Sequence, residues 1–175
     1  MNEIVVTAVG ADRPGIVAAI TGALLELGGN LEETRAALLR GSFATVLAVA
    51  VPDGVGREEV QAALRPVALE LGLGLWVGDA APRTEAPPLP RAVVSVYGAD
   101  HPGIVHAMAT ALAGAGANIV DLSSRLVGDP PIYVLGIEVE LPAGADAVSL
   151  RRALAPVAAQ SGVELAIESE DDEVL

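Results

Sequence analysis

The sequence contains no cysteine and no lysine, and these absences exclude several kinds of site. Without cysteine the chain forms no disulfide, binds no metal through a thiolate and uses no thiol as a nucleophile. Without lysine it lacks the Gly-x-x-x-x-Gly-Lys loop that cradles phosphates. All 10 basic residues are therefore arginines, and they are scattered along the chain rather than grouped.

Aromatic side chains and positive charge are also scarce. The 175 residues include 1 Trp, 2 Tyr and 1 Phe, and the formal net charge is −13. Binding to a phosphate backbone depends on clustered cations, and reading single-stranded bases depends on aromatic stacking. Direct binding to nucleic acid is therefore not expected.

Long apolar runs are missing too, since no stretch reaches the roughly 20 residues that a membrane helix requires. Glu3 is followed at once by a β-branched run, unlike the cationic and apolar regions of a signal peptide. The hydrophobic fraction of 52% is nevertheless sufficient to form a core. We expect a folded, cytoplasmic protein with no membrane contact.

One short motif occurs twice and organises the rest of the chain. Residues 11–17 read Ala-Asp-Arg-Pro-Gly-Ile-Val, and residues 99–105, displaced by 88, read Ala-Asp-His-Pro-Gly-Ile-Val. Further matches follow at the same displacement and later at a displacement of 90, and the two extra residues fall around 128–131. The chain is therefore a tandem duplication.

Hydrophobic periodicity predicts the same order of elements in both copies. In the first copy, β-branched and alternating apolar runs predict strands, and apolar residues at helical spacing predict helices. The expected strands are 4–9, 31–39, 43–51 and 73–77, and the expected helices are 16–27 and 60–71. The order is βαββαβ, and it starts again at about residue 91.

The same patterns predict the domain organisation. Residues 1–78 and 91–168 are expected to be two domains, joined by a proline-rich, semi-rigid linker at 79–90. Residues 169–175 are expected to be a solvated acidic tail. A domain of about 75 residues is marginally stable alone, so we expect internal pairing of the domains, homodimerisation, or both.

Two prolines fall inside predicted helices, where proline costs about 3 kcal/mol. Pro66 and Pro156 occupy the second helix of each copy. Their shared placement leaves two alternatives, a kinked helix or a break into two short helices.

The Asp-x-Pro-Gly turn allows two interpretations. In a structural one, aspartate caps the following helix, proline starts it and glycine allows close packing. In a functional one, N–H groups without partners at residues 15–17 and 103–105 bind the carboxylate of an amino acid. Asp12 or Asp100 then accepts hydrogen bonds from its ammonium group.

Other polar residues also recur at matching places. Asn30 and Asn118 follow the first helix of each copy, either as left-handed residues or as amides that donate to and accept from a ligand. Arg35 and Arg125 lie near the middle of the same predicted strand, as surface charge, in domain pairing or to hold a carboxylate. The polar run 121–125 indicates an exposed sheet face or edge.

No constellation in the sequence predicts catalysis, a cofactor or a metal site. The Gly-x-Ser-x-Gly elbow is missing, and His101 and His106 lie five residues apart without a third ligand nearby. We predict that the chain is not an enzyme and uses no cofactor. Within the turn, His101 adds a pH-sensitive contact.

A βαββαβ unit with Asp-x-Pro-Gly-Ile-Val after its first strand and Gly-x-Asn after its first helix resembles the ACT domain. Residues 12–17 with 28–31 give one match, and residues 100–105 with 116–119 give the other. Two such units without a further domain resemble the stand-alone tandem ACT proteins of the glycine cleavage system repressor group. They also resemble the N-terminal regulatory part of formyltetrahydrofolate deformylase.

The resemblance implies an α+β protein of two ferredoxin-like domains, each a four-stranded antiparallel sheet with two helices on one face. It implies regulation through a small ligand such as an amino acid, bound between paired domains and read by a protein partner. Ligand-binding residues carried over from the family's motif are Asp12, Arg13, Pro14, Gly15, Ile16, Asn30, Asp100, His101, Pro102, Gly103, Ile104, Asn118 and Asp121.

The two copies depart from each other within this pattern. The second copy has the Asn-x-x-Asp spacing of some ligand-binding members, at Asn118 and Asp121, whereas the first has Glu33 at the fourth place. Two other functions stay open: an interaction module without a small ligand, and a regulatory subunit of a separately encoded enzyme.

Overall fold

The computed structural model describes residues 1–81 and 89–169. The chain divides into two compact units, with the division inside the segment 82–88. The elements of the first unit are β1 (Asn2–Ala11), α1 (Ile16–Glu26), β2 (Asn30–Leu39), β3 (Ser42–Val51), α2 (Arg57–Leu71) and β4 (Gly74–Asp79). Those of the second are β5 (Arg91–Gly98), α3 (Ile104–Gly114), β6 (Asn118–Val127), β7 (Ile132–Glu140), α4 (Ala147–Gln160) and β8 (Val163–Ser169).

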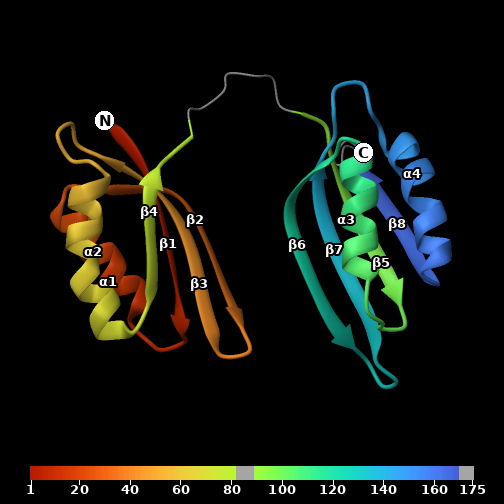
Figure 1. Ribbon diagram of the computed structural model, residues 1–175, viewed down its shortest axis with the longest axis horizontal. Coiled ribbons are helices and arrows are strands. Elements are labelled where there is room, and N and C mark those ends of the chain that lie inside the picture. Colours follow the sequence, from red (N-terminus) through yellow and green to blue (C-terminus); the bar gives the residue numbers. More distant parts are fainter. Residues whose placement is uncertain (82–88, 170–175) are drawn as a thin grey trace, which may run out of the picture. The chain divides into compact units, whose positions relative to one another are not determined.

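Each unit is built on one antiparallel sheet of four strands. The strand orders are β2-β3-β1-β4 and β6-β7-β5-β8, so β1 and β5 lie inside their sheets. Both helices of a unit lie on one face of its sheet (Figure 1). The predicted fold, two α+β ferredoxin-like βαββαβ domains, is confirmed.

Side-chain alternation along the central strands determines which face meets the helices. Along β1 the alternate residues Ile4, Val6 and Ala8 are buried, and the residues between them lie on the opposite face. Helix α1 packs against them with side chains spaced four residues apart, namely Ile16, Ile20 and Leu24. The second unit has a separate core of the same design.

The hairpins explain why the displacement between the copies changes from 88 to 90. Strands β2 and β3 join through Arg40 and Gly41, both with positive φ (49° and 80°), as in the two-residue turns that match strand twist. Strands β6 and β7 are joined by the four residues 128–131. The two extra residues therefore lie in a hairpin loop.

Both helices that contain a proline continue through it. Helix α2 is unbroken around Pro66, and α4 is unbroken around Pro156, so the alternative of two short helices is wrong. Each proline removes a donor to the carbonyl four residues earlier. Both prolines and both of those earlier residues, Ala62 and Arg152, are exposed, so water can hydrate the freed carbonyls.

The predicted domain boundaries stay predictions. Strand β4 includes Asp79 and strand β8 includes Ser169, so each domain's sheet extends one residue past the predicted end. The linker residues 82–88 and the tail residues 170–175 lie outside the described residues.

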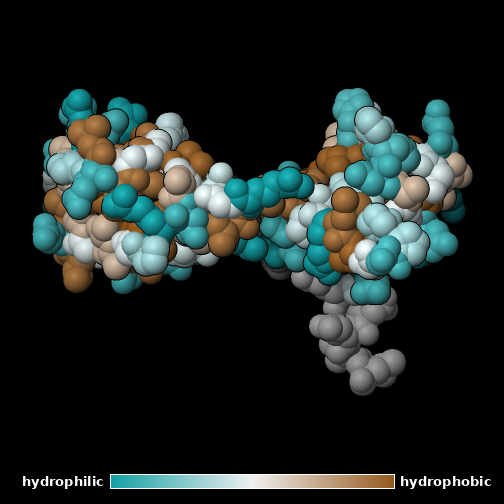
Figure 2. All heavy atoms as spheres, turned by 90° about the horizontal axis from the view of Figure 1, so that it is seen from below, coloured by the Kyte–Doolittle hydropathy of each residue, from teal (hydrophilic) through white to brown (hydrophobic). Residues whose placement is uncertain are grey.

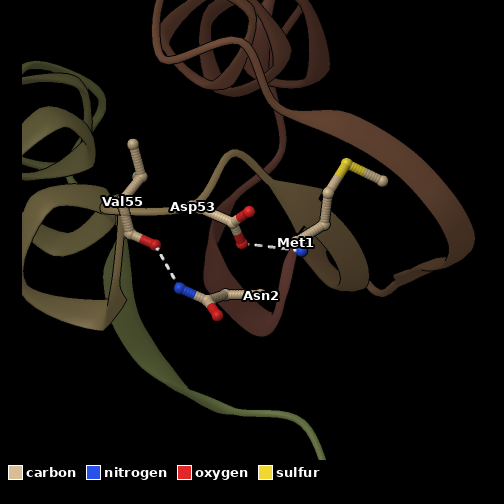
Figure 3. Close-up of polar contacts among 4 residues, drawn as sticks. All are labelled: Met1, Asn2, Asp53 and Val55. Atoms are coloured by element: carbon tan, nitrogen blue, oxygen red, sulfur yellow. Dashed lines mark hydrogen bonds and ion pairs between the residues drawn. The ribbon is translucent and has the colours of Figure 1, made fainter.

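Two contacts tie the start of β1 to the loop between β3 and α2. The Met1 ammonium lies 2.8 Å from Asp53 Oδ1, and Asn2 Nδ2 donates a 2.9 Å hydrogen bond to the Val55 carbonyl (Figure 3). The ammonium group lowers the pKa of the Asp53 carboxyl through this contact. These two contacts fix the beginning of β1, in addition to its pairing with β3 and β4.

Apolar side chains also occur on the surfaces of both units, interspersed with polar ones (Figure 2). The most exposed large ones on helices are Leu69 and Leu25, at 75% and 73%. Within the described residues no helix is long and apolar enough to cross a membrane.

We predict that the two units unfold separately. Leu24 and Leu112 are equivalent core residues with 0% exposure in different clusters. Leu24→Ala should destabilise the first unit by about 2–5 kcal/mol through lost burial and the cavity left behind, and Leu112→Ala should do the same to the second. In calorimetry of the full chain, each variant should lower one transition only. Equal shifts of the whole profile would contradict the prediction.

Candidate functional site

The repeated turn joins the first strand of each unit to its first helix through a left-handed glycine. Gly15 has φ 95° and ψ −7°, and Gly103 has φ 102° and ψ −12°. A Cβ built on either glycine meets no atom within 4 Å. The backbone conformation, not crowding, therefore requires glycine at both positions.

No side chain caps either helix that follows the turn. The first helical hydrogen bonds run from the Ala19 N–H to the Gly15 carbonyl and from the Ala107 N–H to the Gly103 carbonyl, each 2.9 Å. The N–H groups of residues 16–18 and 104–106 therefore have no acceptor within their helices. They point out of the helix start, where the helix dipole is positive.

The interpretation in which aspartate caps the helix and proline starts it is wrong. Helix α1 begins at Ile16 with Gly15 as the capping residue, so Asp12 lies too early to cap it. Asp12 instead donates its backbone N–H to the Gly41 carbonyl at 2.9 Å, which fixes the turn against the hairpin. Among the described residues, the carboxylates of Asp12 and Asp100 have no hydrogen-bond or ion-pair partner.

The other predicted residues of the turn differ in what they can offer a ligand. The side chains of Ile16 and Ile104 are only 2% exposed and belong to the cores, so only their backbone N–H groups are available. Arg13, Pro14 and Pro102 are exposed.

His101 connects the second turn to the end of another helix. Its Nε2 lies 2.8 Å from the carbonyl oxygen of Ser161, the C-cap residue of α4, and its Nδ1 lies 3.1 Å from the Pro102 carbonyl oxygen. Because both ring nitrogens face acceptors, only the doubly protonated ring donates to both. The Ser161 carbonyl, followed by that of Pro102, therefore raises the pKa of His101.

A β-bulge brings the predicted asparagine and acidic residue to one face of the sheet. Residues three apart in a regular strand face opposite sides. In β6 the register shifts between Ile119 and Asp121, so Asn118 and Asp121 both pair with residues on the face away from the helices. An equivalent shift between residues 31 and 33 of β2 does the same for Asn30 and Glu33.

Within one unit the turn and the asparagine do not meet. Gly15 precedes α1 and Asn30 follows it, and a helix of 11 residues separates its ends by about 16 Å. Asn30 instead lines a groove of about 400 Å³ between α1 and the start of β2. A ligand that contacts both a turn and an asparagine therefore needs two domains.

Other sequence expectations concern charge and metals. Arg35 and Arg125 are not equivalent, because Arg35 pairs with Val46 whereas Arg125 lies one row further along its sheet, opposite Val134.

Sequence reasoning did not identify Ser161 as a partner of His101. The bulges could have been inferred, because an Asn-x-x-Asp pair on one strand conflicts with alternation. Among the residues described, no group of three acidic or histidine side chains is placed to hold a metal.

The two sheets, each with helices on one face and an uncapped helix after a Pro-Gly turn, define a tandem ferredoxin-like protein with two candidate anion-binding turns. Models of the ACT domain match residues 2–77 and residues 94–168. The chain belongs to the ACT-domain family.

Several known proteins are similar over nearly the whole chain. The glycine cleavage system transcriptional repressor of Escherichia coli is 29% identical over 98% of this chain and 94% of its own length. The crystal structure of an unknown protein from Galdieria sulphuraria is 30% identical, covers 96% of this chain and 98% of that one, and has a TM-score of 0.84. A phosphoserine phosphatase of Mycobacterium tuberculosis is 28% identical over 95% of this chain, but over only 40% of its own length.

We predict opposite effects for two glycine substitutions at the start and in the middle of α1. Gly15→Ala should destabilise the first unit by about 1–2 kcal/mol, because an L-residue is strained at φ 95°. Gly22→Ala, where a Cβ meets nothing within 4 Å, should stabilise it by about 0.5–1 kcal/mol through helix propensity. Denaturant unfolding measures both, and a neutral Gly15→Ala would show that the turn tolerates a side chain.

The His101 contacts predict a pH-dependent stability of the second unit. Because the folded-state pKa is raised, the stabilisation should be complete below the unfolded-state pKa of about 6.5 and lost as pH rises through the folded-state value. The difference in melting temperature between the wild type and His101→Gln should therefore shrink from pH 5.5 to pH 9. His101→Arg, which copies Arg13, is the control, because its charge persists over this range. If the difference in melting temperature between the wild type and His101→Gln stayed constant over this pH range, the prediction would be wrong.

Proposed function

We propose that this chain is an amino-acid-responsive regulatory protein that binds its ligand at the Asp-x-Pro-Gly turns. The observation that carries the proposal is an uncapped helix start that follows, three residues later, an aspartate whose carboxylate makes no hydrogen bond or ion pair among the described residues, once in each unit. Similarity to a transcriptional repressor over 98% of the chain supports a regulatory role.

The turn supplies complementary groups for a zwitterion. The free N–H groups of residues 16–18 or 104–106 donate to the α-carboxylate, favoured by the positive end of the helix dipole. The exposed carboxylate of Asp12 or Asp100 accepts from the ammonium group. A ligand with only one of these charges satisfies only half of the site.

A second copy of the chain completes the site in this proposal. Because Gly15 and Asn30 lie at opposite ends of α1, the turn of one domain meets the asparagine region of a domain in the other copy. Ligand binding then favours the paired arrangement, and by linkage the ligand changes partner affinity only as far as it prefers that arrangement.

The protein partner reads this change, and the chain has no catalytic activity of its own. The net charge of −13 favours a protein as the target over the phosphate backbone of DNA. A cytoplasmic location follows from this role, because amino-acid levels and gene expression are both controlled there.

A second candidate is a regulatory subunit of a separately encoded enzyme. The similarity to 40% of the length of a phosphoserine phosphatase favours it, since a segment similar to 95% of this chain forms part of a longer enzyme there. Co-purification of a catalytic partner from the source cells would support this candidate, and a regulator of transcription recovered instead would support the first.

We predict that one or two amino acids raise the melting temperature of the full chain in a panel of the twenty amino acids, purines and folates. A ligand at 100 times its Kd adds about 2.7 kcal/mol, which shifts the midpoint of a domain this size by several degrees. Asp12→Asn and Asp100→Asn keep the shape but weaken the ammonium contact, so each should reduce the shift. Asp79→Asn, an exposed carboxylate at the end of β4, is the matched control.

The outcome of this ligand panel distinguishes between the proposed functions. A shift that survives both aspartate substitutions would place the ligand elsewhere and overturn the turn site. No shift with any compound would favour an interaction module without a small ligand.

A further inference from the structure

The second unit has a cavity on the sheet face away from its helices. Alternation and register place two cross-strand rows on this face: Ser123, Gly136 and Ser95 in one, and Arg125, Val134 and Tyr97 in the next. Together with Ser124, these residues line a cavity of about 220 Å³. It lies on the open sheet face, and none of its lining residues belongs to the turn at residues 99–103.

Gly136 lies between Ser123 and Ser95, and because it has no side chain it leaves a space between them. A Cβ built on it would meet Ser123 Oγ at 3.6 Å, an ordinary contact, and its φ is not positive. Neither crowding nor backbone conformation therefore requires glycine. In the first unit the equivalent position is Val46, between Thr7 and Arg35, so a larger side chain fits the same backbone.

The polar groups around the cavity lack partners. Among the described residues, the Arg125 guanidinium and the hydroxyls of Ser95, Ser123 and Tyr97 make no hydrogen bond or ion pair. By contrast, Arg91 on the same face lies 2.9 Å from Glu140 Oε1. The cavity thus combines one cation that has no ion-pair partner among the described residues with four hydroxyl groups, that of Ser124 included.

Acidic residues lie near the cavity but not beside its cation. Asp121 and Glu138 pair in the row beyond the serines, two rows from Arg125. Rows on one face are about 7 Å apart along a strand, so this separation is about 14 Å. The serine row lies between them, about 7 Å from each, so Arg125 is the nearest charge only at its own end of the cavity. Glu164 lies on the far side of Tyr97, opposite it on β8.

We infer that this cavity binds the oxyanion group of a small molecule, a carboxylate or a phosphate. The planar guanidinium of Arg125 matches two oxygens of either group, and the hydroxyls of Ser95 and Ser123 donate to the remaining lone pairs. The inference does not rest on the proposed function, because it uses neither the turns nor the asparagines.

The test is an NMR titration of the ¹⁵N-labelled full chain with sodium phosphate and, separately, with sodium acetate at constant ionic strength. Saturable shifts of the Ser95, Ser123 and Gly136 amides are expected with at least one anion. Saturation by phosphate alone identifies a phosphate site, by acetate alone a carboxylate site, and by both a general oxyanion site. Shifts that rise linearly with both anions would overturn the inference.

Two variants and one control sharpen the test. Arg125→Gln should weaken binding about tenfold or more, because it removes the charge-assisted hydrogen bonds. Gly136→Val, which copies Val46, should abolish binding by filling the cavity. Arg35→Gln, on the matching edge strand of the first unit, should leave binding unchanged. Unchanged affinity in Arg125→Gln would overturn the inference even if Gly136→Val fails to fold.

Discussion

The first helix of each unit depends on one residue that adopts a left-handed conformation. Gly15 and Gly103 turn the chain from an inner strand of the sheet onto the face where the helix packs. Because the same glycine is the N-cap residue, it has no side chain with which to cap the helix. The fold requirement and the exposed N–H groups therefore have the same physical origin. The candidate binding turn is therefore a by-product of the fold, and it occurs twice because the fold does.

Periodicity and duplication made most of the fold predictable. The strand that ends at Leu39 was predicted although most of its side chains are polar or exposed, and it begins at Asn30, one residue earlier than predicted. The continuity of the helix around Pro66 was not predictable, because it depends on which side of the helix faces water. The contact between His101 and Ser161 joins residues 60 apart in sequence, and no local pattern indicates it. The candidate turns could be located in advance, but whether aspartate caps the helix depends on where the helix begins.

The two copies share a core design and differ on their surfaces. Leu24 and Leu112 occupy the same place in equivalent helices, and both are fully buried. At the turn, a permanent cation in the first copy corresponds to a titratable one in the second. On the open face, Val46 in one sheet corresponds to a glycine in the other. Packing limits what can change inside a domain of this size, whereas the exposed positions are free to specialise.

The bulges in β2 and β6 have a consequence for the outer edges of the sheets. Both strands are edge strands, and an edge with a regular row of free backbone groups can take up a strand from another molecule. The extra residues at positions 32 and 120 break that row near its beginning and increase the local twist. An incoming strand can match the ladder on one side of the bulge but not across it. The same irregularity that aligns Asn118 with Asp121 therefore hinders these sheets from growing into continuous fibrils.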